Sequence, residues 1–195
     1  MKLGLIVEGH GEVAAVPVLI RKLCAEHEVW DVEILRPIRG KRDRLVSAKF
    51  SDLERSIALA TFNSADAIIV VVDADDACAA TLGPSILARA DAASAVPIGV
   101  VLVVHEYESW FLASTEALRG HQRVRDDAVF TNDPDEVPNP KAFFERNCMV
   151  DGACYSETVD QAGLSAHIDV EHARTRSASM DKFCREAERL LGIGQ

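Results

Sequence analysis

Acidic residues follow three short apolar segments of the chain, and carboxylates in this pattern can hold a metal ion. Glu8 comes directly after the first of these segments, and Asp73 and Asp75 form an Asp-x-Asp pair after another. Glu106 and Glu108 follow the last. Carboxylates that lie close together repel one another unless they share protons or bind a cation. Because no histidine or cysteine pattern accompanies them, their oxygens favour Mg²⁺ or Mn²⁺ over zinc.

The apolar segments themselves indicate the strands that carry these acids. Strands are predicted at residues 2–7, 32–37, 67–72 and 98–104, and helices at 13–28, 52–62, 84–93 and 109–118. This alternation predicts an α/β fold, with a mostly parallel four-stranded sheet covered by helices on both faces. Open parallel sheets bind ligands beyond the carboxyl ends of their strands, so we expect the acids to gather at one edge.

Other interpretations of these acids stay open at this point. Residues 9–14 fit the G-x-G-x-x-A pattern of dinucleotide-binding loops, although Glu8 and Glu12 beside it would repel a pyrophosphate. Residues 70–76 resemble the Asp-x-Asp segments of sugar-nucleotide transferases and aspartyl phosphatases. Taken one at a time, such acids also serve as turn residues or complement a helix dipole.

The charge of the chain is negative overall but positive in one segment. The net charge is −10, which disfavours adhesion of the whole surface to nucleic acid. Residues 36–49 nevertheless contain the single acid Asp43 and six basic residues, which are Arg36, Arg39, Lys41, Arg42, Arg44 and Lys49. This basic segment is either a local binding site for a polyanion or a solvated loop.

The remaining composition indicates a cytoplasmic protein without a membrane segment or a zinc site. The longest apolar runs are too short to cross a bilayer, and the N-terminal residues do not have the pattern of a signal peptide. The five cysteines form no C-x-x-C pair, and their odd number argues against a disulfide framework. His167, His172 and Cys184 match no zinc module.

The chain changes character after about residue 120. Residues 131–141 contain three prolines among Asn and Asp, which is typical of a loop. Helices are predicted near 141–147 and at 179–191, with little strand signal between them. We therefore predict an α/β core at residues 1–120 and a mainly helical elaboration, packed on that core, at residues 121–195.

The acids and their strands resemble a TOPRIM domain, the metal-binding module of topoisomerases, primases and OLD-type nucleases. Residues 5–9 (LIVEG) are similar to its first motif, a glutamate and a glycine after the first strand. Residues 70–75 (VVVDAD) are similar to its second motif, Asp-x-Asp after the third strand. Glu12 resembles the second glutamate of the OLD-type version. The resemblance implies a Rossmann-like TOPRIM core.

More of the chain resembles one bacterial TOPRIM-like group, the domain-of-unknown-function family DUF4276. Residues 105–113 (HEYESWFLA) are similar to its acidic and aromatic segment, and residues 155–161 and 176–183 are similar to its C-terminal pieces. Members of this group are expected beside an ATPase of the ABC or AAA type, as effectors of anti-phage defence. This partner is implied by the resemblance alone.

Together the acids and the resemblance predict a Mg²⁺- or Mn²⁺-dependent nuclease that hydrolyses phosphodiester bonds, with DNA as the first candidate substrate. The metal ligands are expected to be Glu8, Glu12, Asp73, Asp75 and Glu108, and the alternative role of Glu8 is that of a general acid or base. The basic segment would bind the DNA backbone through Arg36, Arg39, Lys41, Arg42 and Arg44. Lys182, or alternatively Arg176, would supply the catalytic basic residue of OLD-type nucleases. A non-catalytic subunit of an ATPase complex and an Asp-x-Asp nucleotide-sugar or phosphoester enzyme are the alternatives.

Overall fold

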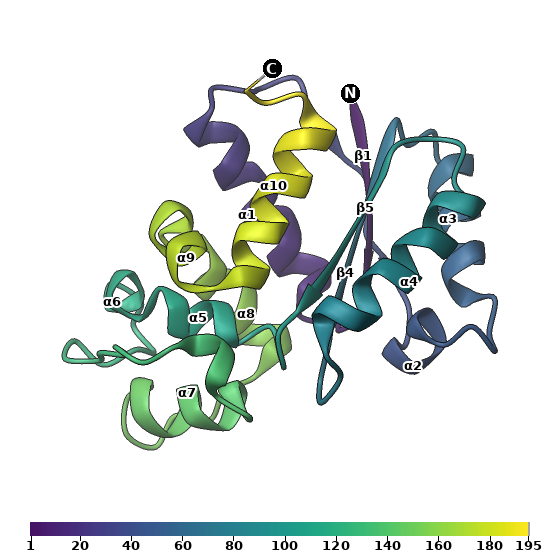
Figure 1. Cartoon of the computed structure of the whole chain (residues 1–195). Coiled ribbons are helices and arrows are strands. Elements are labelled where there is room, and N and C mark those ends of the chain that lie inside the picture. Colours follow the sequence, from purple (N-terminus) through teal and green to yellow (C-terminus); the bar gives the residue numbers. More distant parts are fainter. Residues whose placement is uncertain (195) are drawn as a thin grey trace.

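Five parallel strands form the central sheet in residues 1–194, the part of the chain that the computed structural model describes (Figure 1). β1 (Lys2–Val7) pairs on one side with β4 (Ala67–Asp73), which pairs in turn with β5 (Ile98–Val103). On its other side β1 pairs first with β2 (Glu33–Ile34) and then with β3 (Ile38–Arg39). The predicted α/β fold with a parallel sheet is confirmed.

The strand predicted at residues 32–37 is present only as the short β2, and β3 follows in residues predicted as part of the basic loop. The sheet therefore has five strands among the described residues where four were predicted. Leu3 pairs with Ile34, whereas Ile6 pairs with Ile38, so the offset between the strands grows by one residue. A bulge of one residue therefore interrupts the ladder. Pro37 lies in this interruption, where its missing N–H costs no ladder hydrogen bond.

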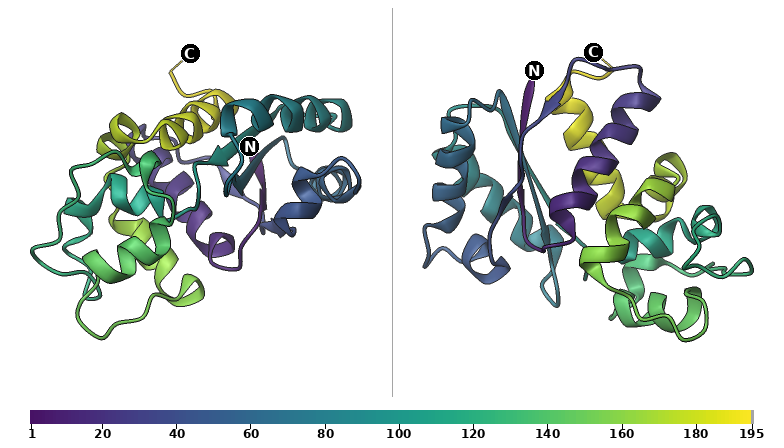
Figure 2. Two further views of the ribbon diagram at one scale, coloured as in Figure 1. Left: turned by 60° about the horizontal axis from the view of Figure 1, so that its bottom comes forward. Right: turned by 180° about the vertical axis from the view of Figure 1, so that it is seen from behind.

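Helices cover both faces of the sheet, as predicted. On one face lie α2 (Arg42–Val46), α3 (Asp52–Phe62) and α4 (Ala79–Ala93), and on the other lie α1 (Glu12–Glu26) and α10 (Ala178–Leu191). β4 is buried between the two layers: its alternate residues belong to two separate hydrophobic clusters, one on each face. Seen from behind, the sheet separates α2 and α3 from α1 and the C-terminal helices (Figure 2).

The C-terminal part of the chain is helical and packs on the α1 side of the sheet. Its core residues belong to the same hydrophobic cluster as residues of β1 and α1. The helix predicted at residues 109–118 is divided at Ser114, which leaves the helical conformation with φ −129°. The elements of this part before α10 are α5 (Ser109–Ala113), α6 (Thr115–Leu118), the 3₁₀ helix η1 (Pro134–Glu136), α7 (Pro140–Cys148), α8 (Glu157–His167) and α9 (Val170–Arg176).

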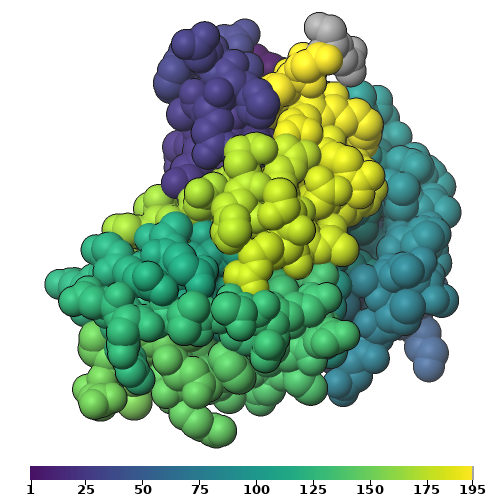
Figure 3. Space-filling model, turned by 60° about the vertical axis from the view of Figure 1, so that its left-hand side comes forward, coloured from purple at the N-terminus to yellow at the C-terminus, as the bar shows by residue number. Residues whose placement is uncertain are grey.

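α10 joins the two parts of the molecule. It packs on β5 and β4 and also contacts α9. In the space-filling view it lies between α1 and the segment that contains α4 (Figure 3). Within the described residues, the helices are all too short or too polar to cross a bilayer.

Candidate metal centre

The adjacent carboxyl ends of β1 and β4 bring Glu8 and Asp73 into contact. Glu8 Oε2 accepts a hydrogen bond from the backbone N–H of Asp73 at 3.3 Å. Glu12, in the first turn of α1, accepts hydrogen bonds from the N–H groups of Glu8 at 2.9 Å and Gly9 at 3.1 Å. A Cβ atom on Gly9 would lie 2.9 Å from Glu12 Oε1, so a larger residue here would displace the Glu12 carboxylate. The predicted proximity of these acids is thus present.

A short bridge between the ends of β4 and β5 positions the remaining acids. The N–H of Asp75 donates to the carbonyl oxygen of His105 at 2.9 Å. Both residues adopt the left-handed conformation, with φ of 48° and 57° respectively. Such conformations cost free energy in non-glycine residues and are concentrated at functional sites. Glu108 then follows at the start of α5 and is only 3% exposed.

The acids raise one another's proton affinity. Burial, followed by the charge of Glu12, raises the pKa of Glu8 to about 7. Burial raises the pKa of Asp73 well above its usual range, and the charges of Glu12, Glu8, Glu108 and Asp75 add to this effect. Burial also raises the pKa of Glu108 to about 7. Five carboxylates therefore act on one space, where only protons or cations relieve their repulsion.

These residues fit a hydrated divalent cation. Every charged donor is a carboxylate oxygen, which suits Mg²⁺. Asp73 Oδ1 is buried and has no hydrogen-bond partner among the described residues, so an acceptor is available at the centre of the group. The oxygens of these acids do not bring three ligands within 4.8 Å of one another. That spacing is compatible with Mg²⁺, which usually keeps several water molecules and takes only one or two carboxylates directly.

The basic segment lies beside these acids. A cavity of about 350 Å³ is lined by Glu8, Gly9, Arg39, Lys41, Arg42, Asp43 and Asp75. Arg42 Nε lies 3.0 Å from Asp75 Oδ2. Of the other predicted phosphate-binding residues, Arg44 is exposed and pairs with Asp52 at 3.0 Å, and Arg36 is exposed on the outer strand region. The structure thus places part of the basic segment at the acids.

One protein-family model matches nearly the whole chain. The model of the family described as "Domain of unknown function (DUF4276)" matches residues 7–188. The chain belongs to the DUF4276 family. The matched span contains every acid of the candidate metal centre as well as the basic segment. Among curated proteins and among solved structures, no match is found.

The two basic residues expected to be catalytic lie elsewhere in this DUF4276 protein. Lys182 pairs with Glu186 on α10 and lines a separate, largely apolar cavity of about 620 Å³ between α4, β5 and α10. Arg176 stacks over Phe130, 5.7 Å from the ring centre, and donates to the carbonyl oxygen of Asn132. No contact of either side chain with the five acids is found among the described residues.

Lys141 is a basic residue near the acids that the sequence did not reveal. Its backbone N–H donates to Glu106 Oε2 at 3.1 Å, and its ammonium group pairs with Glu157. Its positive charge opposes the effect of burial on the pKa of Glu108. Lys141 stands at the start of α7, and only the packing of the C-terminal part shows its proximity, so the local sequence holds no signal for it.

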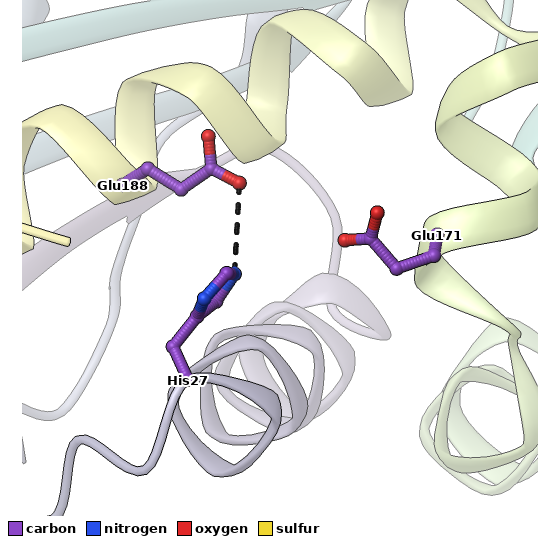
Figure 4. A group of neighbouring side chains, drawn as sticks. All are labelled: His27, Glu171 and Glu188. Atoms are coloured by element: carbon purple, nitrogen blue, oxygen red, sulfur yellow. Dashed lines mark ion pairs between the residues drawn. The ribbon is translucent and has the colours of Figure 1, made fainter. Parts of the chain in front are cut away.

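A second group of metal-type ligands lies away from the strand ends. His27 at the end of α1, Glu171 on α9 and Glu188 on α10 point toward one another (Figure 4). His27 Nε2 is 3.9 Å from Glu188 Oε1. Arg174 already pairs with both glutamates, through Nη1 at 3.4 Å from Glu171 Oε1 and Nη2 at 3.2 Å from Glu188 Oε2. Because this guanidinium compensates the acids, we assign the group a structural role in joining the three helices.

Proposed function

We propose that this DUF4276 protein is a TOPRIM-type, Mg²⁺-dependent nuclease that hydrolyses phosphodiester bonds in nucleic acid. The observation that carries the proposal is the contact between Glu8 and Asp73 at the strand ends, next to a cavity that Glu8 and Asp75 share with basic side chains. Metal-assisted phosphoryl chemistry requires carboxylates that bind the metal ion and, next to them, basic side chains that bind the phosphate. An ATPase partner, a role in anti-phage defence and a cytoplasmic location are parts of the same proposal.

Each residue has a distinct part in the proposed reaction. Glu8, Asp73 and Asp75 hold the cation, and Glu12 fixes the Glu8–Gly9 turn through its two backbone hydrogen bonds. Bound Mg²⁺ supplies an acidified water molecule and neutralises charge on the phosphate. In the alternative arrangement Asp73 and Asp75 hold the cation, and Glu8 is the general acid or base.

The basic residues bind the substrate in this proposal. Arg39, Lys41 and Arg42 line the cavity and attract the phosphate, since phosphate contacts position a nucleic acid without reading its sequence. Lys141 replaces Lys182 as the basic residue from the C-terminal part, because it lies among Glu106, Glu108 and Glu157.

A second candidate function is a non-catalytic binding subunit of an ATPase complex. Two observations favour it: the acids do not bring three ligand oxygens within 4.8 Å of one another, and Lys182 makes no contact with them among the described residues. In this case the same site would bind nucleic acid without cleaving it.

Incubation of the purified protein with supercoiled plasmid, single-stranded DNA or RNA, in Mn²⁺ or Mg²⁺, separates the candidates. We expect metal-dependent cleavage that the double variant Asp73→Asn/Asp75→Asn loses at least 100-fold, as metal ligands are removed. Asp91→Asn, an exposed acid on α4, is the matched control. Binding without cleavage selects the non-catalytic subunit, and release of phosphate or sugar from small phosphoesters selects an Asp-x-Asp enzyme. Cleavage that survives in the double variant excludes this site.

A further inference from the structure

Arg42 is docked on the turn that carries the Asp-x-Asp pair. Its Nε donates to the carbonyl oxygen of Asp73 at 3.1 Å and lies 3.0 Å from Asp75 Oδ2. Its Nη2 donates to the carbonyl oxygen of Ala74 at 2.6 Å. The Arg42 side chain is 18% exposed, whereas that of Asp75 is 52% exposed. The guanidinium is therefore built into the end of β4 and holds the more open of the two aspartates.

The other cations of the same cavity are free to receive an anion. Arg39 and Lys41 are exposed and form no ion pair with another described residue. An anion that they attract arrives next to Arg42, because all three side chains line the same cavity of about 350 Å³. Arg42 Nη1 also lies 3.3 Å from Oδ1 of the exposed Asp43. A phosphate offers a guanidinium two parallel charge-assisted hydrogen bonds, and it thus competes with these single oxygens of Asp75 and Asp43.

We propose that Arg42 couples the two ligands of the site: it neutralises Asp75 until a substrate phosphate takes the guanidinium, and Asp75 is then free to bind the divalent cation. The inference rests on the proposed function, because it takes Asp75 as a metal ligand. Arg42 is a positioning residue in this scheme. Phosphate and metal then bind with positive cooperativity, and by linkage each raises the affinity for the other by the same factor.

The first test compares Mn²⁺ binding, followed by the electron paramagnetic resonance signal of free Mn²⁺, in wild type and two charge-matched variants. Arg42→Gln removes the guanidinium that pairs with Asp75, whereas Lys41→Gln removes one positive charge from the same cavity without that contact. We expect Arg42→Gln to bind Mn²⁺ about tenfold more tightly than Lys41→Gln does, a difference of about 1.4 kcal/mol. Equal affinities in the two variants would overturn the inference.

The second test examines the same ion pair through variants of Asp75, and this comparison does not require the Arg42 variant to fold. Asp75→Asn releases Arg42, and Asp76→Asn removes a charge from the adjacent exposed acid. Without metal, we expect Asp75→Asn to bind thymidine monophosphate several-fold more tightly than Asp76→Asn does. In wild type the same nucleotide is expected to raise Mn²⁺ affinity about tenfold, and this coupling to fall in Arg42→Gln.

The outcomes separate this inference from the proposed function. Absence of Mn²⁺ binding in wild type, with and without the nucleotide, and in Arg42→Gln would overturn both. A different outcome would overturn only the role of Arg42. In that case Mn²⁺ binding requires Asp73, Arg42→Gln and Lys41→Gln have equal Mn²⁺ affinities, and Asp75→Asn and Asp76→Asn have equal affinities for thymidine monophosphate.

Discussion

Burial gives the acids at the strand ends different proton affinities. Glu12 is buried, but its carboxylate accepts two backbone N–H groups, which stabilise its charged form. Glu8 accepts a hydrogen bond from one backbone N–H, that of Asp73, whereas Asp73 Oδ1 accepts no hydrogen bond from the described residues. Burial nevertheless raises the pKa of all four buried acids, Glu8, Glu12, Asp73 and Glu108, and the increase is large for Asp73, which has the fewest hydrogen bonds to offset it.

The raised pKa values predict how stability changes with pH. The pKa of Glu8 and of Glu108 is about 7 in the folded protein, against an ordinary value of 4.5. Between these values the folded state holds protons that the unfolded state has lost, so the free energy of unfolding falls as pH rises. Without metal, we expect a loss on the order of 2 kcal/mol from about pH 5 to about pH 8, since solvent screening reduces the share of the partly buried Glu8.

Thermal unfolding with and without Mg²⁺ measures this dependence. Because the proposed cation site consists of ionised acids, Mg²⁺ should raise Tm more at about pH 8 than at about pH 5. Glu108→Gln should flatten the dependence, whereas Glu33→Gln, an exposed acid of β2, should leave it unchanged. A metal-free protein that becomes more stable from pH 5 to pH 8 would contradict the assigned pKa values.

The acids of the site and its neighbours from the basic segment could be predicted from sequence, but the basic residues of the C-terminal part could not. Glu8, Asp73 and Asp75 follow strands whose parallel pairing forces their ends together, so their positions in the chain were sufficient. Lys141 reaches the same place through the packing of α7, and Lys182 faces another cavity on α10. Neither position has a local sequence signal, because each depends on contacts between distant parts of the chain.

Among the elements, the buried strands and long helices were predictable because their apolar patterns are continuous. α3 occupies the predicted residues 52–62, and β1 the predicted residues 2–7. α8 was missed because its buried face is largely polar: Asp160, Gln161 and Ser165 are all at most 3% exposed. Leu164 is the only apolar residue among the four buried ones of α8, so hydrophobic periodicity is a weak signal for this helix.

The polar face of α8 predicts an unusual sensitivity to substitution. Asp160 accepts the backbone N–H of Ser156 at 2.8 Å, and its Oδ1 lies 3.1 Å from Arg123 Nε. Asp160→Ala removes the partner of the Ser156 N–H and the carboxylate that pairs with Arg123, so we expect the free energy of unfolding to fall by about 2–4 kcal/mol in urea titrations. Val159→Ala, at a 72% exposed position of the same helix, should change it by less than about 0.5 kcal/mol. Similar small effects in both variants would show that the polar contacts do not hold α8 in place.

At the scale of the whole molecule, the sheet and the C-terminal helices share one core. The cluster on the α1 side contains Leu5 and Leu19 of the N-terminal half together with Phe144, Leu164 and Phe183 of the C-terminal half. The alternation of strands and helices predicted the sheet with its two covered faces. The packing of residues 121–194 was beyond reach, because it follows from side-chain shapes that meet only in the folded chain.

This shared core leads us to expect that a fragment of residues 1–120 does not fold alone. Trp110 shows why: it is fully buried, its ring centre is 5.2 Å from that of Phe183, and its Nε1 donates to Ser179 Oγ at 2.9 Å. Removal of α10 exposes this indole and the apolar α1 face of the sheet. Each large side chain that becomes exposed costs about 2 kcal/mol of hydrophobic free energy, and the sum over several of them is comparable to the whole stability of a typical domain.

Trp110 also provides the measurement. In the full chain its fluorescence and the far-ultraviolet circular dichroism should change in one coincident transition with urea, because the α/β part and the C-terminal helices unfold together. The variant Trp30→Phe, at a 75% exposed position, removes the only other tryptophan from the signal. Two separate transitions, or a fragment 1–120 that unfolds cooperatively by itself, would show instead that the metal centre stands on an independent core and that the C-terminal helices are only attached to it.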